Sequence, residues 1–63
     1  MTKYTAPKEL YKGQLLWYAA DDLGMVIVEV LTIRNDKCEV IVVSGDGTCF
    51  WVDQFTLMER RRD

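Results

Sequence analysis

Residues 25–34, Met-Val-Ile-Val-Glu-Val-Leu-Thr-Ile-Arg, are followed across Asn35-Asp36 by residues 38–43, Cys-Glu-Val-Ile-Val-Val. β-Branched side chains dominate both runs, and such side chains favour strands because they pack well on a pleated surface. Asn and Asp between two runs of this kind favour a two-residue turn. The stretch therefore predicts a β-hairpin in which Arg34 pairs with Lys37.

Turn signals on either side of this hairpin divide the rest of the chain into short segments. Residues 44–47, Ser-Gly-Asp-Gly, form the strongest turn signal, and Gly13 breaks the chain before an apolar run. The segment 53–55 has the length of a single 3₁₀ turn. We therefore predict an all-β chain with a short 3₁₀ turn before its last strand. The five predicted strands cover residues 14–18, 25–34, 38–43, 48–52 and 56–59.

This order of elements resembles that of SH3-like barrels, the superfamily of small barrels that includes Tudor and KOW domains. The resemblance is carried by Gly13 at the first strand, Val28-x-Val30, Ile41-x-Val43, the turn Gly45-Asp46-Gly47, and Val52 and Leu57 on either side of the 3₁₀ turn. It implies a five-stranded SH3-like barrel over 13–59, with an N-terminal arm over 1–12 and a basic C-terminal tail over 60–63. It covers about three quarters of the chain, and a shared fold does not specify a function.

Length and charge restrict the class of protein. The 63 residues suffice for one domain, and the net charge of −2 argues against a general affinity for nucleic acid or anionic membranes. No apolar run approaches the ~18 residues of a membrane span, and residues 1–7 lack the apolar stretch of a signal peptide. We therefore expect a cytoplasmic protein without membrane association, in which Cys38 and Cys49 stay reduced.

The residues that usually carry catalysis are scarce. The chain has no His, which removes the usual general base and the commonest metal ligand. Two Cys residues at this spacing do not make a zinc site, and Ser44 is better explained as a turn residue than as a nucleophile. We predict no catalytic residue, no cofactor and no metal site, and hence a binding module rather than an enzyme.

The predicted hairpin register assigns each side chain to a face, because side chains alternate across a strand. Counting back from the turn at Asn35-Asp36 places Val30 opposite Ile41, and the next turn places Ile41 opposite Phe50. The predicted inward face carries Val26, Val28, Val30, Ile41, Val43, Phe50 and Val52, with Leu57 and Leu16. The predicted outward face carries Met25, Ile27, Glu29, Leu31, Ile33, Cys38, Val40, Val42, Cys49, Trp51 and Asp53.

The outward set is mostly apolar, whereas a strand meander normally turns a polar face to water. An exposed apolar patch of a few hundred Å² marks an interaction site. We therefore predict a protein-binding surface centred on Trp51, covered by a second copy of the chain or by another protein. Its predicted residues are Ile27, Leu31, Val40, Val42 and Trp51. Two alternatives stay open: a bent barrel could turn some of these residues inward, or the N-terminal arm could fold over them.

Basic residues near both ends of the chain suggest an alternative partner. If the first and last strands are antiparallel neighbours, the two ends meet at one pole of the barrel. The residues concerned are Lys8, Lys12, Arg60, Arg61 and Arg62. Such a pole could bind nucleic acid through its phosphates, although a solvated tail also explains the charges. The small size and lack of catalytic groups fit an accessory protein of a bacterium, phage or mobile element.

Overall fold

The computed structural model describes residues 2–62, and over that range the chain consists of strands, turns and one 3₁₀ turn. The prediction of an all-β chain is confirmed, with six strands instead of five. The strands are β1 (Thr2–Thr5), β2 (Leu15–Ala20), β3 (Gly24–Arg34), β4 (Lys37–Val42), β5 (Cys49–Asp53) and β6 (Leu57–Arg62). The 3₁₀ turn Gln54–Thr56 joins β5 to β6, close to its predicted position.

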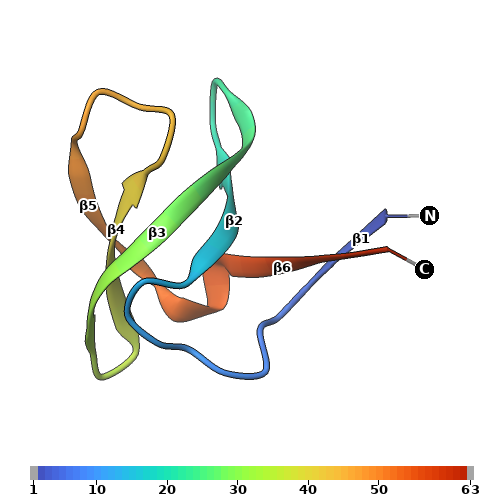
Figure 1. Ribbon diagram of the computed structural model, residues 1–63, viewed down its shortest axis with the longest axis horizontal. Helices are drawn as coiled ribbons and strands as arrows, with labels where there is room; N and C mark the ends of the chain where they lie inside the picture. Colours follow the sequence, from blue (N-terminus) through green and yellow to red (C-terminus); the bar gives the residue numbers. More distant parts are fainter. Residues whose placement is uncertain (1, 63) are drawn as a thin grey trace.

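All six strands belong to one antiparallel sheet with the order β1-β6-β2-β3-β4-β5. The first and last of the five predicted strands are neighbours, as expected, because Trp17 of β2 lies opposite Met58 of β6. The sheet curls into a half-barrel but does not close, since no pairing within residues 2–62 joins β5 to the opposite edge (Figure 1).

The sixth strand arises where an arm and a tail were expected. β1 pairs with the second half of β6, so that Tyr4 lies opposite Arg60. The two strands leave the body of the sheet as a narrow ribbon with both chain ends at its tip (Figure 1). We call this two-stranded segment, Thr2–Thr5 with residues 59–62, the terminal ribbon.

A β-bulge at Leu31 decides which face of the sheet each residue of β4 occupies. Near the turn the register is as predicted, with Arg34 opposite Lys37 and Thr32 opposite Glu39. The register then shifts between Val30 and Thr32, because Leu31 is an extra residue on β3.

The shift changes every pairing beyond the bulge. Val30 lies opposite Val40 instead of Ile41. The predicted pairing of Ile41 with Phe50 is also wrong, for a separate reason: β4 ends at Val42 and β5 begins at Cys49, and this longer connection places Val40 opposite Phe50. A shift of one residue moves a strand's side chains to the other face. The predicted faces of β4 are therefore wrong: Cys38, Val40 and Val42 face inward, whereas Ile41 and Val43 face outward.

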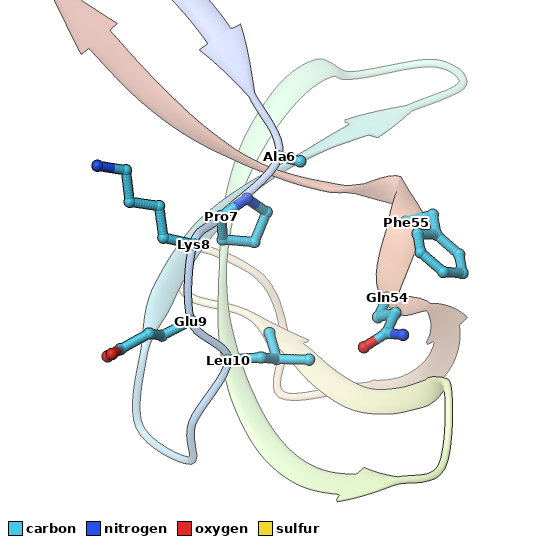
Figure 2. A pocket seen from close by; sticks show the side chains of 7 residues that line it. All are labelled: Ala6, Pro7, Lys8, Glu9, Leu10, Gln54 and Phe55. Atoms are coloured by element: carbon cyan, nitrogen blue, oxygen red, sulfur yellow. The ribbon is translucent and has the colours of Figure 1, made fainter.

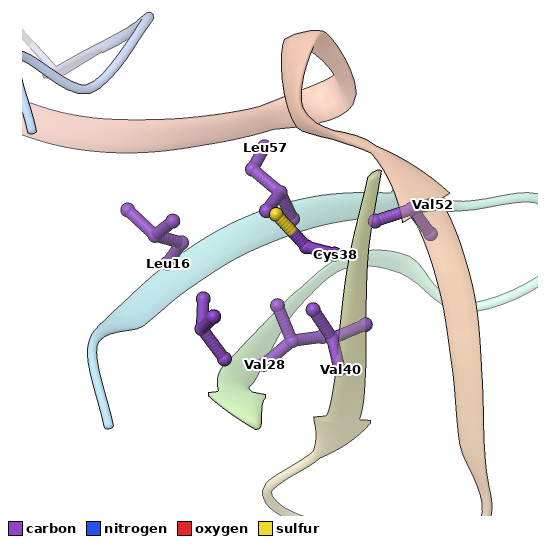
Figure 3. Packing of buried hydrophobic residues seen from close by; sticks show 7 residues of the cluster. Leu16, Val28, Cys38, Val40, Val52 and Leu57 are labelled. Atoms are coloured by element: carbon purple, nitrogen blue, oxygen red, sulfur yellow. The ribbon is translucent and has the colours of Figure 1, made fainter. Parts of the chain in front are cut away.

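The core lies inside the curl of the sheet (Figure 3). It consists of Leu16, Val28, Val30, Cys38, Val40, Val52 and Leu57, with Leu10, Tyr18, Val26, Ile33, Val42 and Phe50 packed against it. The inward predictions for β3 as far as Val30, for β5 and for Leu57 are confirmed. Ile33 was predicted outward and packs inward, because it follows the bulge.

The connection between β1 and β2 packs against the core. Leu10 packs against the core, and the Gln14 side chain is buried. The Tyr11 N–H donates to Gln14 Oε1 (3.1 Å), and Gln14 Nε2 donates to the Glu9 carbonyl (3.1 Å). Gly13, with a φ of 86°, donates its N–H to the Val30 carbonyl (2.7 Å), a left-handed conformation that favours glycine. This connection therefore packs on the core side of the sheet through Leu10 and Gln14.

Candidate functional site

The outward side of the sheet is built from cross-strand rows of side chains, because residues opposite one another point to the same side. Leu15, Glu29, Ile41 and Cys49 form one row across β2 to β5. Met58, Trp17, Ile27 and Val43 form the next row, in which the Val43 N–H donates to the Ile27 carbonyl. We call the apolar part of this surface the outer face; its residues are Leu15, Trp17, Ile27, Ile41, Val43, Trp51 and Met58.

Several side chains of the outer face are freely accessible. Leu15 is 61% exposed, Val43 55%, Trp51 47% and Ile27 37%. Together they present a few hundred Å² of apolar surface, the size of patch that is often functional on a small monomer. At about 25 cal/mol per Å², covering it would contribute several kcal/mol to an association. The outer face is therefore a candidate binding surface.

Charged groups occupy one end of this side of the sheet. Arg34, Lys37 and Asp53 form the row nearest the β3–β4 turn. Lys37 Nζ lies 2.8 Å from Asp53 Oδ1, and this hydrogen bond and the carboxylate's charge raise the pKa of Lys37. Both side chains are about half exposed, so the pair is screened by water.

Two carboxylates lie nearer the apolar rows. Glu39 accepts a hydrogen bond from the Thr32 hydroxyl (3.2 Å). Glu29 lies between Leu15 and Ile41, and no described side chain forms an ion pair or hydrogen bond with its carboxylate. The outer face thus combines an apolar surface with an acidic group that has no partner within the described chain.

An aromatic cluster joins the outer face to the terminal ribbon. The Tyr4 and Trp17 rings meet edge to face with centroids 5.8 Å apart. The Arg60 guanidinium carbon lies 5.3 Å from the Trp17 ring centroid, a cation–π distance. Tyr4 of the N-terminal segment thus lies against Trp17 at the margin of the outer face. Leu15, Ile27 and Trp51 stay uncovered.

The predicted protein-binding residues are not all brought together. Ile27 and Trp51 lie on the outward side and are exposed, whereas Leu31 is half-buried at the bulge. Val40 has no exposed surface, and Val42 packs against the core, so neither belongs to an exposed surface.

Leu15, Ile41 and Val43 were missed as outward residues. Glu39 could have identified Ile41 and Val43 as outward residues. A carboxylate is expected on the solvent side of the sheet, and side chains two and four residues further along a strand lie on the same side. The centre of the surface lies over β2 to β4, and Trp51 stands toward the β5 edge of the sheet.

The basic residues of the alternative prediction are distributed over two places. Arg60 belongs to the terminal ribbon. The backbones of Arg61 and Arg62 continue β6 and pair with Lys3 and Thr2. The side chains of Arg61 and Arg62 lie outside the described part of the chain. Lys8 and Lys12 lie in the connection that leaves β1 at the end away from the chain termini (Figure 1). The described side chains therefore do not form one continuous basic pole.

A hollow of about 270 Å³ lies between the β1–β2 connection and the 3₁₀ turn (Figure 2). Its lining includes Pro7, Leu10, Gln54 and Phe55, and Phe55 is 80% exposed. Leu10 and Gln54 extend toward one another across it, whereas Lys8 and Glu9 point away (Figure 2). Because Lys8 and Glu9 do not converge on the hollow, the Gln54 amide is the polar side chain that extends across it, without a charged group to orient a ligand.

The two cysteines lie on opposite sides of the sheet. Cys38 is buried opposite Val52, and burial raises the pKa of its thiol. Cys49 is exposed opposite Ile41, so both are free thiols. Residues 2–62 contain no group of three His, Cys, Asp or Glu side chains placed to hold a metal ion, and no helix long and apolar enough to cross a membrane.

Comparison with known proteins adds no relative. No protein-family model matches the chain, and neither a curated protein nor a solved structure is significantly similar to it. The geometry of the outer face is therefore the main guide to function.

Proposed function

We propose that this chain is a small non-catalytic protein-binding module on an open SH3-like framework, and that the outer face is its binding surface. The proposal is carried by one observation: Leu15, Ile27 and Val43 are exposed on the same side of the sheet. The order of β2 to β6, with the 3₁₀ turn before the last strand, supports the SH3-like framework. On this interpretation β1 is an addition at the sheet edge, paired with the end of β6.

The packing of the sheet argues that these side chains serve association rather than folding. The inside of the curl is already filled by the buried core, and the β1–β2 connection contributes Leu10 to it. The outer rows therefore have no role in the core, yet they keep Leu, Ile and Val where a solvated sheet normally carries polar residues. Such residues are expected when another protein surface covers them.

Introducing a negative charge on the outer face tests this proposal. Ile27→Glu and Val43→Glu each place a charge on the outer face, whereas the matched control Phe55→Glu places it at an exposed apolar residue beside the hollow. Circular dichroism checks that all three variants fold. We expect the first two to lose association, measured as the sedimentation coefficient of the purified chain and as capture of partner proteins by the immobilised chain. Phe55→Glu should behave as the wild type.

Two results would contradict the proposal. One is that folded Ile27→Glu and Val43→Glu keep all the associations of the wild type. The other is that only Phe55→Glu loses them, which would assign binding to the hollow.

Nucleic-acid binding is a second candidate, favoured by the position of Arg60 over Trp17 beside Tyr4. Aromatic rings next to a guanidinium can stack on the bases of single strands. The candidate predicts that the chain binds a single-stranded oligonucleotide at low salt and that Arg60→Ala or Trp17→Ala weakens binding. Absence of a fluorescence anisotropy change with labelled DNA and RNA at low salt would eliminate it.

A further inference from the structure

We infer that the partner of the outer face is a second copy of the chain, in a two-fold dimer whose axis runs along β2 above that face. The inference rests on the proposed function, because it uses the same surface and names its occupant. It is carried by the positions of one acidic and one basic side chain on either side of β2.

The acidic side chain is Glu29. It lies between Leu15 and Ile41, and no described side chain pairs with its carboxylate. Any surface that covers Leu15 also removes water from Glu29. Desolvating an unpaired carboxylate is costly, so the covering surface must bring a cation to this position.

The basic side chain is Arg60. It extends over the Trp17 ring, which places it on the same side of the sheet as Leu15 and Ile27. It is exposed, and no described carboxylate forms an ion pair with it. The face therefore presents a cation and an anion, neither of which has an ion-pair partner among the described side chains.

The sheet order places these two charges on opposite sides of β2. In the sequence of strands β6-β2-β3, Arg60 belongs to β6 and Glu29 belongs to β3. A two-fold axis along β2 exchanges the sides, so that β6 of one copy lies over β3 of the other. Arg60 then faces Glu29 of the second copy, and by symmetry the pair occurs twice.

The apolar residues follow the same symmetry. Leu15 and Trp17 lie on β2, near the axis, and meet the same residues of the second copy. Met58 of β6 and Ile27 of β3 lie opposite Trp17 on its two sides, so they meet one another across the dimer. A self-complementary interface needs this kind of matched placement.

The available area fits a modest dimer. The curved sheet makes contact along β2, and the terminal ribbon extends beyond it with Tyr4 and Arg60 (Figure 1). We expect the two copies together to bury on the order of 1,000 Å², the lower end for specific interfaces. Such a dimer should dissociate on dilution and weaken as salt screens the charge pairs.

Sedimentation equilibrium of charge-reversed variants tests the inference. Glu29→Arg and Arg60→Glu each turn two attractive pairs into two repulsive ones, and each should weaken the dimer about a hundredfold. An equimolar mixture of these two variants should recover the wild-type affinity, because every pair in the mixed dimer again joins opposite charges. Arg34→Glu is the matched control at the far end of the sheet and should keep the wild-type affinity.

Three results would overturn the dimer: a monomeric wild type, single reversals that leave the affinity unchanged, or a mixture that fails to associate. Glu29→Gln covers the case in which Glu29→Arg does not fold; it should weaken the dimer about tenfold, and no change would count against the inference. The proposed function fails separately, when folded Ile27→Glu keeps every association of the chain. If the wild type is monomeric but binds another protein, and Ile27→Glu loses that binding, the second copy is refuted as the partner. The proposed function then stands.

Discussion

Exchanging the neighbours Val40 and Ile41 for threonine, one at a time, tests the register that the bulge imposes. Val40 is fully buried on the inward side, and Ile41 is half-buried on the outward side. Threonine keeps the β-branched shape in both places and replaces apolar atoms by a hydroxyl. The two variants therefore place the hydroxyl on opposite sides of the sheet, and Ile41→Thr also removes the terminal methyl group of Ile41.

The expected cost follows from burial. β4 pairs with a strand on each side, so its backbone is engaged in both ladders and the buried hydroxyl of Val40→Thr must compete for a partner. Leaving it unsatisfied costs about 2 kcal/mol. A chain of this length has roughly 3–9 kcal/mol of stability in total, so the loss is a large fraction. Ile41→Thr keeps its hydroxyl near water and should cost less than about 1 kcal/mol.

Urea unfolding followed by tryptophan fluorescence measures both costs. The protein concentration should be low enough for the chain to be monomeric, and the m-value should match that of the wild type so that midpoints can be compared. A larger loss of stability in Ile41→Thr than in Val40→Thr would contradict the bulged register. That order would restore the register without a bulge, in which Ile41 lies in the core.

Four further predictions rest on the described contacts. Alkylation of the folded chain should modify Cys49 rapidly and Cys38 only after unfolding, and equal rates would contradict the burial of Cys38. Burial raises the pKa of the Cys38 thiol. The stability that the buried thiol contributes is therefore complete below the ordinary thiol pKa and is lost as the pH rises through the raised value. In alkaline buffer the urea midpoint of Cys38→Ala should fall less than that of the wild type. Gln14→Leu should lower the unfolding free energy by about 1–3 kcal/mol, because the Tyr11 N–H and the Glu9 carbonyl lose their partner, and an unchanged midpoint would contradict this. Deleting Leu31 removes the extra residue and makes Val30–Val40 and Thr32–Glu39 consecutive pairs, so the register on both sides is kept and any fall in the urea midpoint should come from the lost bend of the bulge; a deletion variant with the wild-type midpoint would show that the bulge is dispensable.

The strands could be located from sequence because each run of β-branched residues is bounded by Gly or by Asn-Asp. The pairing next to the turn could be predicted as well, since Asn35 has the positive φ of 56° that its side chain tolerates. The bulge could not be located, because Val30, Leu31 and Thr32 all suit a strand and nothing local marks one as extra. What demands it is the curl of the whole sheet, which a bulge increases.

The candidate site could be predicted only in part, because the side of the sheet on which the β4 residues lie depends on the bulge. Ile27 lies where the alternation placed it, because it precedes the bulge on β3. Trp51 also lies on the predicted side, because the β4–β5 register differs from the predicted one by one residue and offsets the shift at the bulge. Val40 and Val42 were assigned to the wrong side, since a run of Val, Ile and Val looks the same in both registers. The terminal ribbon escaped prediction because Thr2–Thr5 is short and polar, and its partner is at the other end of the chain.

The most direct test of an outer face covered by a second copy is an isotope-filtered NOE measurement on a mixture of labelled and unlabelled chains. It detects only protons of one copy that lie within about 5 Å of the other. We predict cross-peaks from the labelled Leu15 methyl groups to Leu15 and Trp17 of the unlabelled chain, and from labelled Ile27 to unlabelled Met58. Intermolecular peaks at Phe55 with none at Leu15 or Ile27, or no intermolecular peaks at millimolar concentration, would contradict the account.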